Sequence, residues 1–133
     1  MLFELAVGFA LGGLFILYAR RGGPARESLV FAVGLVVAAV IYIGFALANG
    51  APARALLLES FGVLPFGLLA WLGLRRSQLW LALGWAAHVA WDLGLNAGVR
   101  APAFVPSWYP VVCVSFDLLV AGYIVAQVRV WVR

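Results

Sequence analysis

Five long apolar runs, separated by short polar connections, constrain most strongly how this chain can fold. Each run is close to the ~20 residues that an α-helix needs to cross the hydrocarbon core of a bilayer. Hydrophobic residues make up 66% of the chain and charged residues 11%, whereas a soluble domain is about half apolar and a quarter charged. The sequence therefore predicts an all-α integral membrane bundle of five transmembrane helices in a single domain, residues 1–133. The expected helices cover residues 2–19, 28–49, 55–74, 79–95 and 107–128.

The arginines predict how this bundle is oriented. The first run has Glu4 at its start and arginines after it, the reverse of a cleavable signal peptide, so we expect a retained helix. Seven arginines fall in the connections after the first and third runs and in the tail, against two on the opposite side. Because cytoplasmic segments carry the excess of arginine, we predict an outside N-terminus and a cytoplasmic C-terminus, in a multipass protein of the cell inner membrane. The seven are Arg20, Arg21, Arg26, Arg75, Arg76, Arg129 and Arg133, and the two are Arg54 and Arg100.

The residue types that the chain lacks exclude several kinds of site. The sequence contains no lysine, which excludes a retinal or pyridoxal-phosphate Schiff base and a Walker-type phosphate site. Cys113 is the only cysteine, so neither an internal disulfide nor a thiolate metal cage can form. The net charge of +4 is explained by the cytoplasmic arginines, and we expect no nucleic-acid partner.

Ionisable residues inside three of the runs are the candidate catalytic groups. His88 and Asp92 are four residues apart, so on a helix they lie on one face, one turn apart. A charged side chain at the centre of a bilayer costs about 2.5–3.5 kcal/mol on insertion scales and rarely faces lipid. With a rise of about 1.5 Å per residue, His88 and Asp117 each lie roughly 15 Å deep, and Glu59 lies in the outer half. We therefore expect His88, Asp92, Asp117 and Glu59 to share one polar chamber near the outer side.

A substrate pocket is expected around these groups. Tyr109, Cys113 and Asp117 follow at i, i+4 and i+8 and share one helix face. Trp85 and Trp91 flank the site on its own helix and would wall an apolar ligand. The predicted pocket residues are Tyr42, Trp85, Trp91, Asn96, Tyr109 and Cys113.

Each candidate also has a structural interpretation. His88 and Asp92 would then be a buried hydrogen-bonded pair that fixes helix packing, and Asp117 a protonated acid bonded to a backbone carbonyl. Glu59 would extend to the outer interface, and Cys113 would pack as a small hydrophobe.

Three functions follow from these alternatives. The first is a membrane-embedded enzyme for a lipid or isoprenoid substrate, with His88 oriented by Asp92 as an acid or base and with Asp117 or Glu59 as proton donor. In a variant of it, His88, Asp92, Asp117 and Glu59 hold a divalent metal, and this oxygen-rich set suits manganese, magnesium or iron better than structural zinc. The second is a proton-coupled carrier or ion-binding subunit, whose path a homo-oligomer would complete. The third is a structural assembly partner. Membrane lipid is the expected partner in the first.

The C-terminal half also resembles a known group of proteins. Its motifs are His88-x-x-Trp91-Asp92, then Pro106-Ser107-Trp108-Tyr109-Pro110, then Cys113-x-x-Phe116-Asp117. This pattern resembles small bacterial multipass membrane proteins of unknown function, a resemblance that implies no particular activity. In architecture alone, the predicted bundle is similar to small membrane-embedded isomerases and terpene cyclases, which use buried acids among about five helices.

Overall fold

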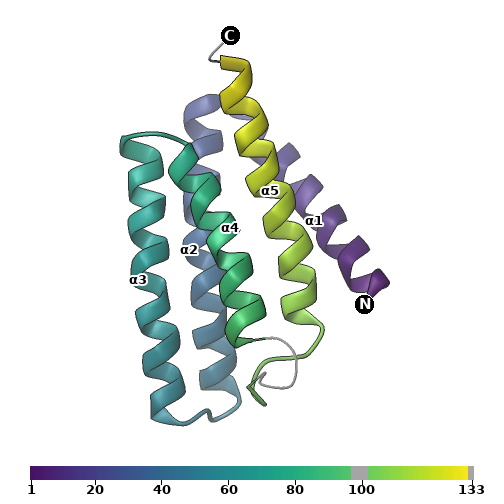
Figure 1. The fold of residues 1–133 in the computed structure, drawn as a ribbon, viewed down its shortest axis with the longest axis vertical. Helices are drawn as coiled ribbons and strands as arrows, with labels where there is room; N and C mark the ends of the chain where they lie inside the picture. The colour runs from purple at the N-terminus through teal and green to yellow at the C-terminus, as the bar shows by residue number, and fades with distance from the viewer. Residues whose placement is uncertain (97–101, 132–133) are drawn as a thin grey trace.

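The structure is a computed structural model, which describes residues 1–96 and 102–131. It is an all-α bundle of five helices, and the described residues contain no strand. The helices are α1 (Leu2–Arg20), α2 (Pro24–Ala48), α3 (Ala53–Arg75), α4 (Leu79–Leu95) and α5 (Tyr109–Trp131). Figure 1 shows them side by side, with α4 between α3 and α5. The prediction of an all-helical bundle of five helices is confirmed.

Prolines and a glycine determine where two of the helices begin. Gly23 precedes α2 with a φ of 83°, a conformation that glycine adopts without a steric penalty. Pro24 then opens the helix, because the first turn does not use the N–H that proline lacks. As a result α2 begins four residues before the expected start at Ser28. Pro110 occupies the first turn of α5 in the same way, and this helix begins two residues after the expected start at residue 107.

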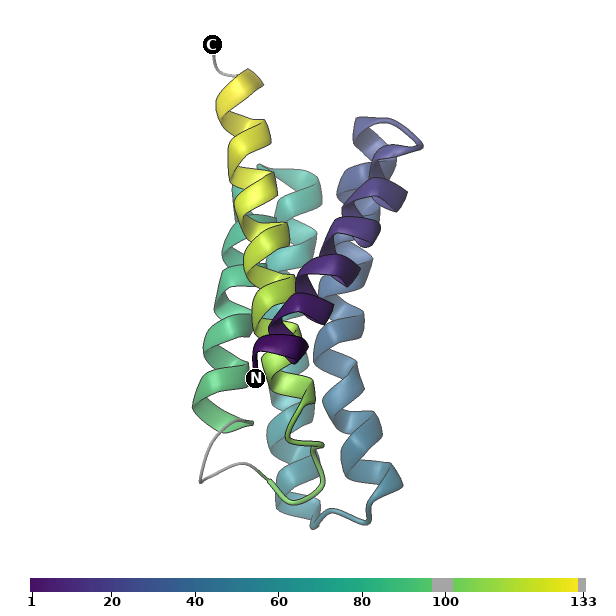
Figure 2. The same cartoon turned by 90° about the vertical axis from the view of Figure 1, so that its right-hand side faces the viewer.

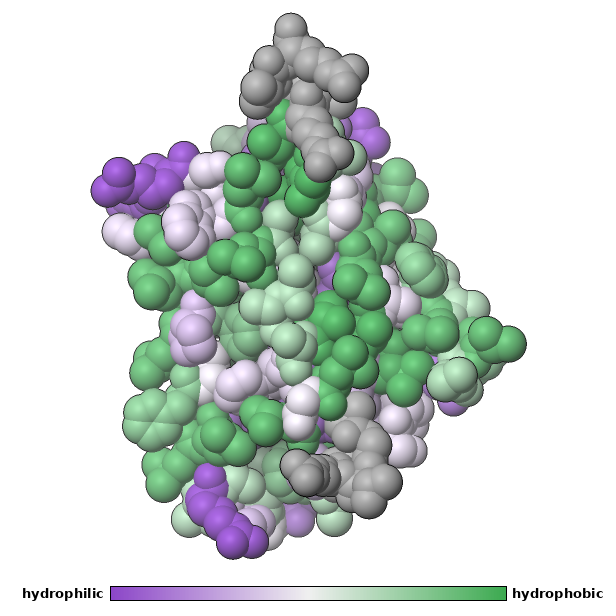
Figure 3. Space-filling view, in the orientation of Figure 1, coloured by the Kyte–Doolittle hydropathy of each residue, from purple (hydrophilic) through white to green (hydrophobic). Residues whose placement is uncertain are grey.

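The surface of the bundle matches a hydrocarbon environment. Four helices, α1, α2, α3 and α5, are long and apolar enough to cross a membrane. The fifth, α4, has 17 residues and is shorter. Large apolar side chains are exposed along the helices, among them Leu14, Phe61, Leu64 and Trp71, and Figure 3 shows such residues over most of one face. So much exposed apolar surface is characteristic of contact with lipid or with another chain. The four long apolar helices and their exposed apolar side chains are consistent with a multipass membrane protein.

Helix α1 packs on the last helix rather than on its neighbour in the sequence. Its contact with α5 runs through Gly8 and Gly12, where an added Cβ would meet Val112, Ser115 or Phe116. Such small residues let two helix backbones approach closely. Figure 2 shows α1 meeting α2 at their connection and diverging from it toward the N-terminus. Helices α1 and α2 therefore form a V, closed at their connection and open toward the N-terminus of α1.

Five of the described arginines lie at the end of the bundle that carries the α1–α2 and α3–α4 connections. Arg20, Arg21 and Arg26 lie in or beside the first connection, and Arg75 and Arg76 lie at the end of α3. Arg54 lies in the first turn of α3, at the other end. Arg100 and Arg133 lie outside the described residues. The orientation of the bundle and the identity of the membrane stay predictions.

Candidate functional site

The site is built around a histidine whose ring nitrogen faces two carboxylates. His88 lies near the middle of α4, with Asp92 one turn further on and Asp117 on α5. His88 Nδ1 is 2.8 Å from Asp117 Oδ2 and 3.5 Å from Asp92 Oδ2. Each of the three residues is at most 1% exposed. Such a cluster is costly in an apolar interior unless its groups are paired, and here they pair with one another.

A tyrosine from a third helix completes the cluster. The Tyr42 hydroxyl, on α2, donates a hydrogen bond of 2.5 Å to Asp92 Oδ1. Tyr42 is fully buried, like Asp92 and His88. A continuous chain of polar contacts therefore runs from Tyr42 through Asp92 and His88 to Asp117, and it joins α2, α4 and α5 in the middle of the bundle. We call these four residues the His88 cluster.

Two atoms of the His88 cluster have no hydrogen-bond partner among the described residues. They are His88 Nε2 and Asp92 Oδ2. Around the imidazole stand aromatic rings, with Phe66 edge-on at a centroid distance of 5.0 Å and Tyr42 at 6.1 Å. An unpaired buried polar atom costs about 1–3 kcal/mol. Most buried polar atoms in proteins are paired, so these two atoms leave open hydrogen-bonding positions in the His88 cluster.

The three ionisable groups also have the spacing of metal ligands. One ligand atom from each of His88, Asp92 and Asp117 lies within 4.8 Å of the other two. Ligands about 2.0–2.2 Å from one ion lie roughly 3 to 3.5 Å apart. The separations of 2.8 and 3.5 Å from Nδ1 to the two carboxylates are close to that range. The chemistry and spacing of this donor set fit a divalent ion.

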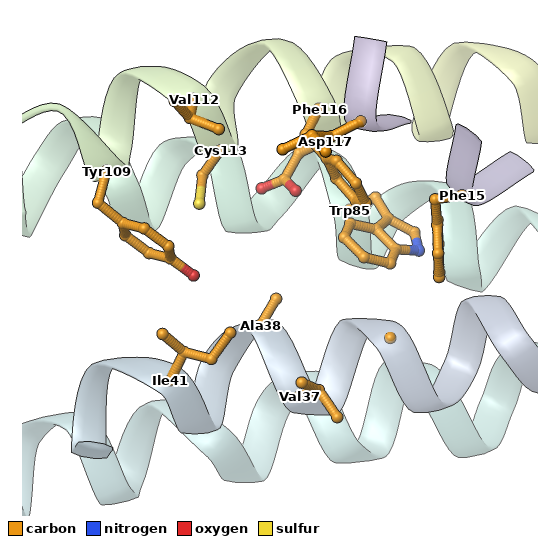
Figure 4. A pocket seen from close by; sticks show the side chains of 12 residues that line it. Phe15, Val37, Ala38, Ile41, Trp85, Tyr109, Val112, Cys113, Phe116 and Asp117 are labelled. Carbon is orange, nitrogen blue, oxygen red and sulfur yellow. The ribbon is translucent and has the colours of Figure 1, made fainter. Parts of the chain in front are cut away.

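A cavity of about 260 Å³ adjoins the His88 cluster on the side of the V. Asp117, Cys113 and Tyr109 line it from one face of α5, and Figure 4 shows their polar atoms directed toward α2. Trp85 and Phe15 line its far end, where the indole nitrogen points at the phenylalanine ring. The rest of its wall is apolar, with Leu11, Gly34, Val37, Ala38, Ile41, Val112 and Phe116.

Within the His88 cluster, the carboxylate of Asp117 is the group that reaches this cavity. His88, Asp92 and Tyr42 are not among the residues that line it. The histidine therefore lies behind the aspartate as seen from the cavity. The sequence predicted His88 as the acid or base, and in the structure Asp117 rather than His88 lines the cavity.

Glu59 lies apart from the His88 cluster. Its carboxylate accepts a hydrogen bond of 3.2 Å from Trp91 Nε1, and the side chain is 3% exposed. Glu59 also borders a second hollow of about 700 Å³ between the ends of α2, α3 and α4, together with Arg54. Asn96 is fully buried at the end of α4, and neither polar atom of its side chain is hydrogen-bonded among the described residues. The four predicted catalytic residues thus divide into a group of three and one separate carboxylate.

Comparison with known proteins places the chain in a family. A family model described as a family of unknown function (DUF6010) matches residues 4–130. The chain belongs to this family. No curated protein and no solved structure matches the chain. The matched region therefore includes the His88 cluster and the residues that line the cavity. Because the function of the family is unknown, the match assigns no activity to them.

Three phenylalanines around the site of this DUF6010 protein were not among the residues predicted from the sequence. Phe15 and Phe116 line the cavity and lie 5.3 Å apart between ring centroids, and Phe66 packs on His88. The sequence pattern that could have indicated Phe15 is its i, i+4 spacing from Leu11, which puts both residues on one face of the first helix. That spacing could not show which helix lies opposite.

Proposed function

We propose that this protein is a membrane-embedded enzyme that acts on a lipid or isoprenoid substrate by transferring a proton. One observation carries the proposal. The buried carboxylate of Asp117 is hydrogen-bonded to His88 on one side and lines an apolar cavity on the other. A proton donor or acceptor at the wall of an apolar cavity, backed by a second titratable group, is an arrangement that acid–base catalysis uses.

The roles of the residues follow from their order in the chain of contacts. Asp117 exchanges a proton with the substrate, and His88 exchanges that proton with Asp117 across the 2.8 Å contact. Asp92 faces the same nitrogen from the next turn of α4, and Tyr42 fixes Asp92. Asp92 and Tyr42 are therefore positioning residues, like the third group that orients the base in other catalytic sites.

A metal-assisted form of the same function uses the same three ligands. A divalent ion such as manganese, magnesium or iron would be held by His88, Asp92 and Asp117 and would supply a Lewis acid beside the cavity. Glu59 is not one of these metal ligands, because its carboxylate lies apart from them and accepts a hydrogen bond from Trp91 Nε1. Elemental analysis of the purified protein, with and without chelator, separates the two forms. A stoichiometric ion that Asp117→Asn removes would favour the metal form.

A proton-coupled carrier is the second candidate. The observation in its favour is that His88 and Asp117 lie near the middles of α4 and α5, where proton relays of membrane proteins are found. A relay must be reached from both sides of the bilayer. Toward the arginine-rich end, the hydrogen-bonded polar pairs of the described residues are Gln78 with Ser28 and Gln127 with Tyr123, and neither pair contacts the His88 cluster. We therefore rank the enzyme first.

Lipid analysis of the reconstituted protein tests the proposed enzyme. Liposomes made from a total bacterial lipid extract would be incubated with the wild type, with His88→Gln, with Asp117→Asn and with a control, Glu27→Gln. The control makes the same acid-to-amide change at the distant start of α2. We expect mass spectrometry to detect a lipid that is consumed by the wild type and the control but not by the other two variants. Identical lipid profiles for all four proteins, together with proton flux that depends on His88, would overturn the enzyme in favour of the carrier.

A further inference from the structure

The opening between α1 and α2, which we call the crevice, leads to the buried Asp117. The cavity lies inside the V, with Leu11 and Phe15 on the α1 side and Val37 and Ile41 on the α2 side. Val37 is 49% exposed, so this wall reaches the outer surface of the bundle. A smaller hollow of about 220 Å³ adjoins it between α1 and the start of α5, and both hollows are lined by Leu11 and Val112. We call these two adjoining hollows, which share the wall residues Leu11 and Val112, the furrow, and Asp117 lines the larger of them.

The surroundings of this furrow determine what fills it. In a membrane, the space beside α1 and α2 is occupied by lipid chains, and the furrow walls are almost entirely apolar. Its main cavity of about 260 Å³ is just below the roughly 300–1,000 Å³ typical of sites for small ligands. That volume suits one narrow chain. A polar headgroup would find few hydrogen-bond partners there and would lose its contact with water.

The depth of Asp117 shows which part of a lipid it can meet. It is eight residues from Tyr109 and fourteen from Trp131, the two ends of α5. At about 1.5 Å per residue these separations are roughly 12 and 21 Å. Headgroups lie outside a hydrocarbon core of about 30 Å. The carboxylate is therefore at the level of the lipid chains and far from either layer of headgroups.

We propose that the crevice between α1 and α2 is a lateral entrance and binding site for one hydrocarbon chain of a membrane lipid, and that Asp117 meets the chain rather than the headgroup. This inference rests on the proposed function and narrows its substrate to a lipid whose reacting group lies within the chain. The chain enters sideways from the bilayer between α1 and α2. Its middle carbons lie beside Asp117, with Trp85 and Phe15 beyond them.

Photolabelling with phospholipids that carry a diazirine at different positions of one acyl chain tests this site. Alkyl carbenes and diazo species formed from diazirines react readily with carboxylic acids, so Asp117 is itself a reporter. The protein would be reconstituted with probes that carry the diazirine near the headgroup, at mid-chain or at the chain end. We expect mass spectrometry to find the Asp117 peptide labelled mainly by the mid-chain probe. An excess of a long-chain prenol, added as competitor, shows whether prenyl chains share the site with acyl chains.

Two valines of α2 provide a matched pair of variants. Val37 and Val40 are 49% and 44% exposed, and of the two only Val37 lines the cavity. We expect Val37→Trp to fill the mouth of the crevice and to lower labelling of the Asp117 peptide at least fivefold, and Val40→Trp to leave it unchanged. Equal labelling in both variants, or labelling of this peptide mainly by the headgroup-proximal probe, would overturn the inference.

The outcomes separate this inference from the proposed function. If lipid conversion depends on Asp117 while its peptide is labelled mainly by the headgroup-proximal probe, the enzyme stands and the chain site is wrong. If the mid-chain probe labels Asp117 in a Val37-dependent manner but no lipid is converted, the chain site stands and the catalytic proposal is wrong.

Discussion

His88 Nδ1 and Asp117 Oδ2 lie 2.8 Å apart although the two residues are 29 positions apart and belong to different helices. The pair joins α4 to α5 at a point where both side chains are buried. It therefore has a structural effect that can be measured whether or not the protein is an enzyme.

A double-mutant cycle on this pair measures that effect. We expect His88→Ala and Asp117→Ala each to lower the free energy of unfolding, because each leaves its partner buried and unpaired. The double variant should lose less than the sum of the two, with a coupling of up to about 1.7 kcal/mol, since hydrogen bonds within a membrane helix bundle average about 0.6 kcal/mol and reach about 1.7 kcal/mol. Unfolding in mixed detergent micelles provides the measurement. Strict additivity would show that the contact is not formed.

The contact between Tyr42 and Asp92 predicts the effect of a single hydroxyl. Tyr42→Phe keeps the buried ring but removes the donor to Asp92 Oδ1, and we expect it to cost about 1 kcal/mol of unfolding free energy. The matched control is Tyr18→Phe, since that ring is 53% exposed. If both variants unfold alike, Tyr42 does not hold Asp92. In the proposed enzyme, Tyr42→Phe should also slow turnover without abolishing it, because Tyr42 acts only through Asp92.

Two glycines of α1 distinguish the helix contact from the rest of the surface. A Cβ at Gly8 would collide with the Val112 carbonyl and the Ser115 hydroxyl, whereas a Cβ at Gly13 would meet nothing within 4 Å. We expect Gly8→Ala to destabilise the protein by about 1–3 kcal/mol through overpacking. Gly13→Ala should leave it unchanged or stabilise it by up to about 1 kcal/mol, because alanine favours the helix. Thermal unfolding in detergent ranks the two. The opposite ranking would contradict the packing of α1 on α5.

The arginines predict the topology, which reporter fusions can read. Green fluorescent protein fused after residue 133 should fluoresce, since it folds in the cytoplasm, and alkaline phosphatase fused there should be inactive. Alkaline phosphatase inserted in the α2–α3 connection near Gly50 should be active. These outcomes follow from the gathering of Arg20, Arg21, Arg75 and Arg76 at one end of the bundle. The reverse pattern would place the C-terminus outside.

Helix number and the pairing within the His88 cluster could be predicted because both depend on local spacing. Runs of about 20 apolar residues predict spanning helices, and the i, i+4 spacing of His88 and Asp92 puts them on one face. The rise per residue along each helix predicted that Asp117 lies at the same depth in the membrane as His88. These arguments use only distances along the chain, which a regular helix converts directly into positions.

The arrangement of the helices around one another could not be predicted in the same way. Depth alone put Glu59 with the other acids, but its carboxylate is directed to Trp91, because rotation about the helix axis decides which neighbour a side chain meets. Gly8 and Gly12, one helical turn apart, favour a close helix contact but do not identify the partner helix. The crevice exists because α1 packs on α5 and not on α2. No local sequence pattern shows which helix packs on α1.

The length of α4 has a consequence for the membrane around it. Its 17 residues extend only about 26 Å at 1.5 Å per residue, against about 30 Å of hydrocarbon. A helix shorter than the bilayer is accommodated by local thinning, at a cost of fractions of a kcal/mol per ångström of mismatch. We therefore expect a thinner bilayer beside α4, the helix that carries His88, and a free energy of unfolding of the protein that depends on the thickness of the host membrane. Shorter acyl chains in the host bilayer would relieve this mismatch and lengthening them would increase it.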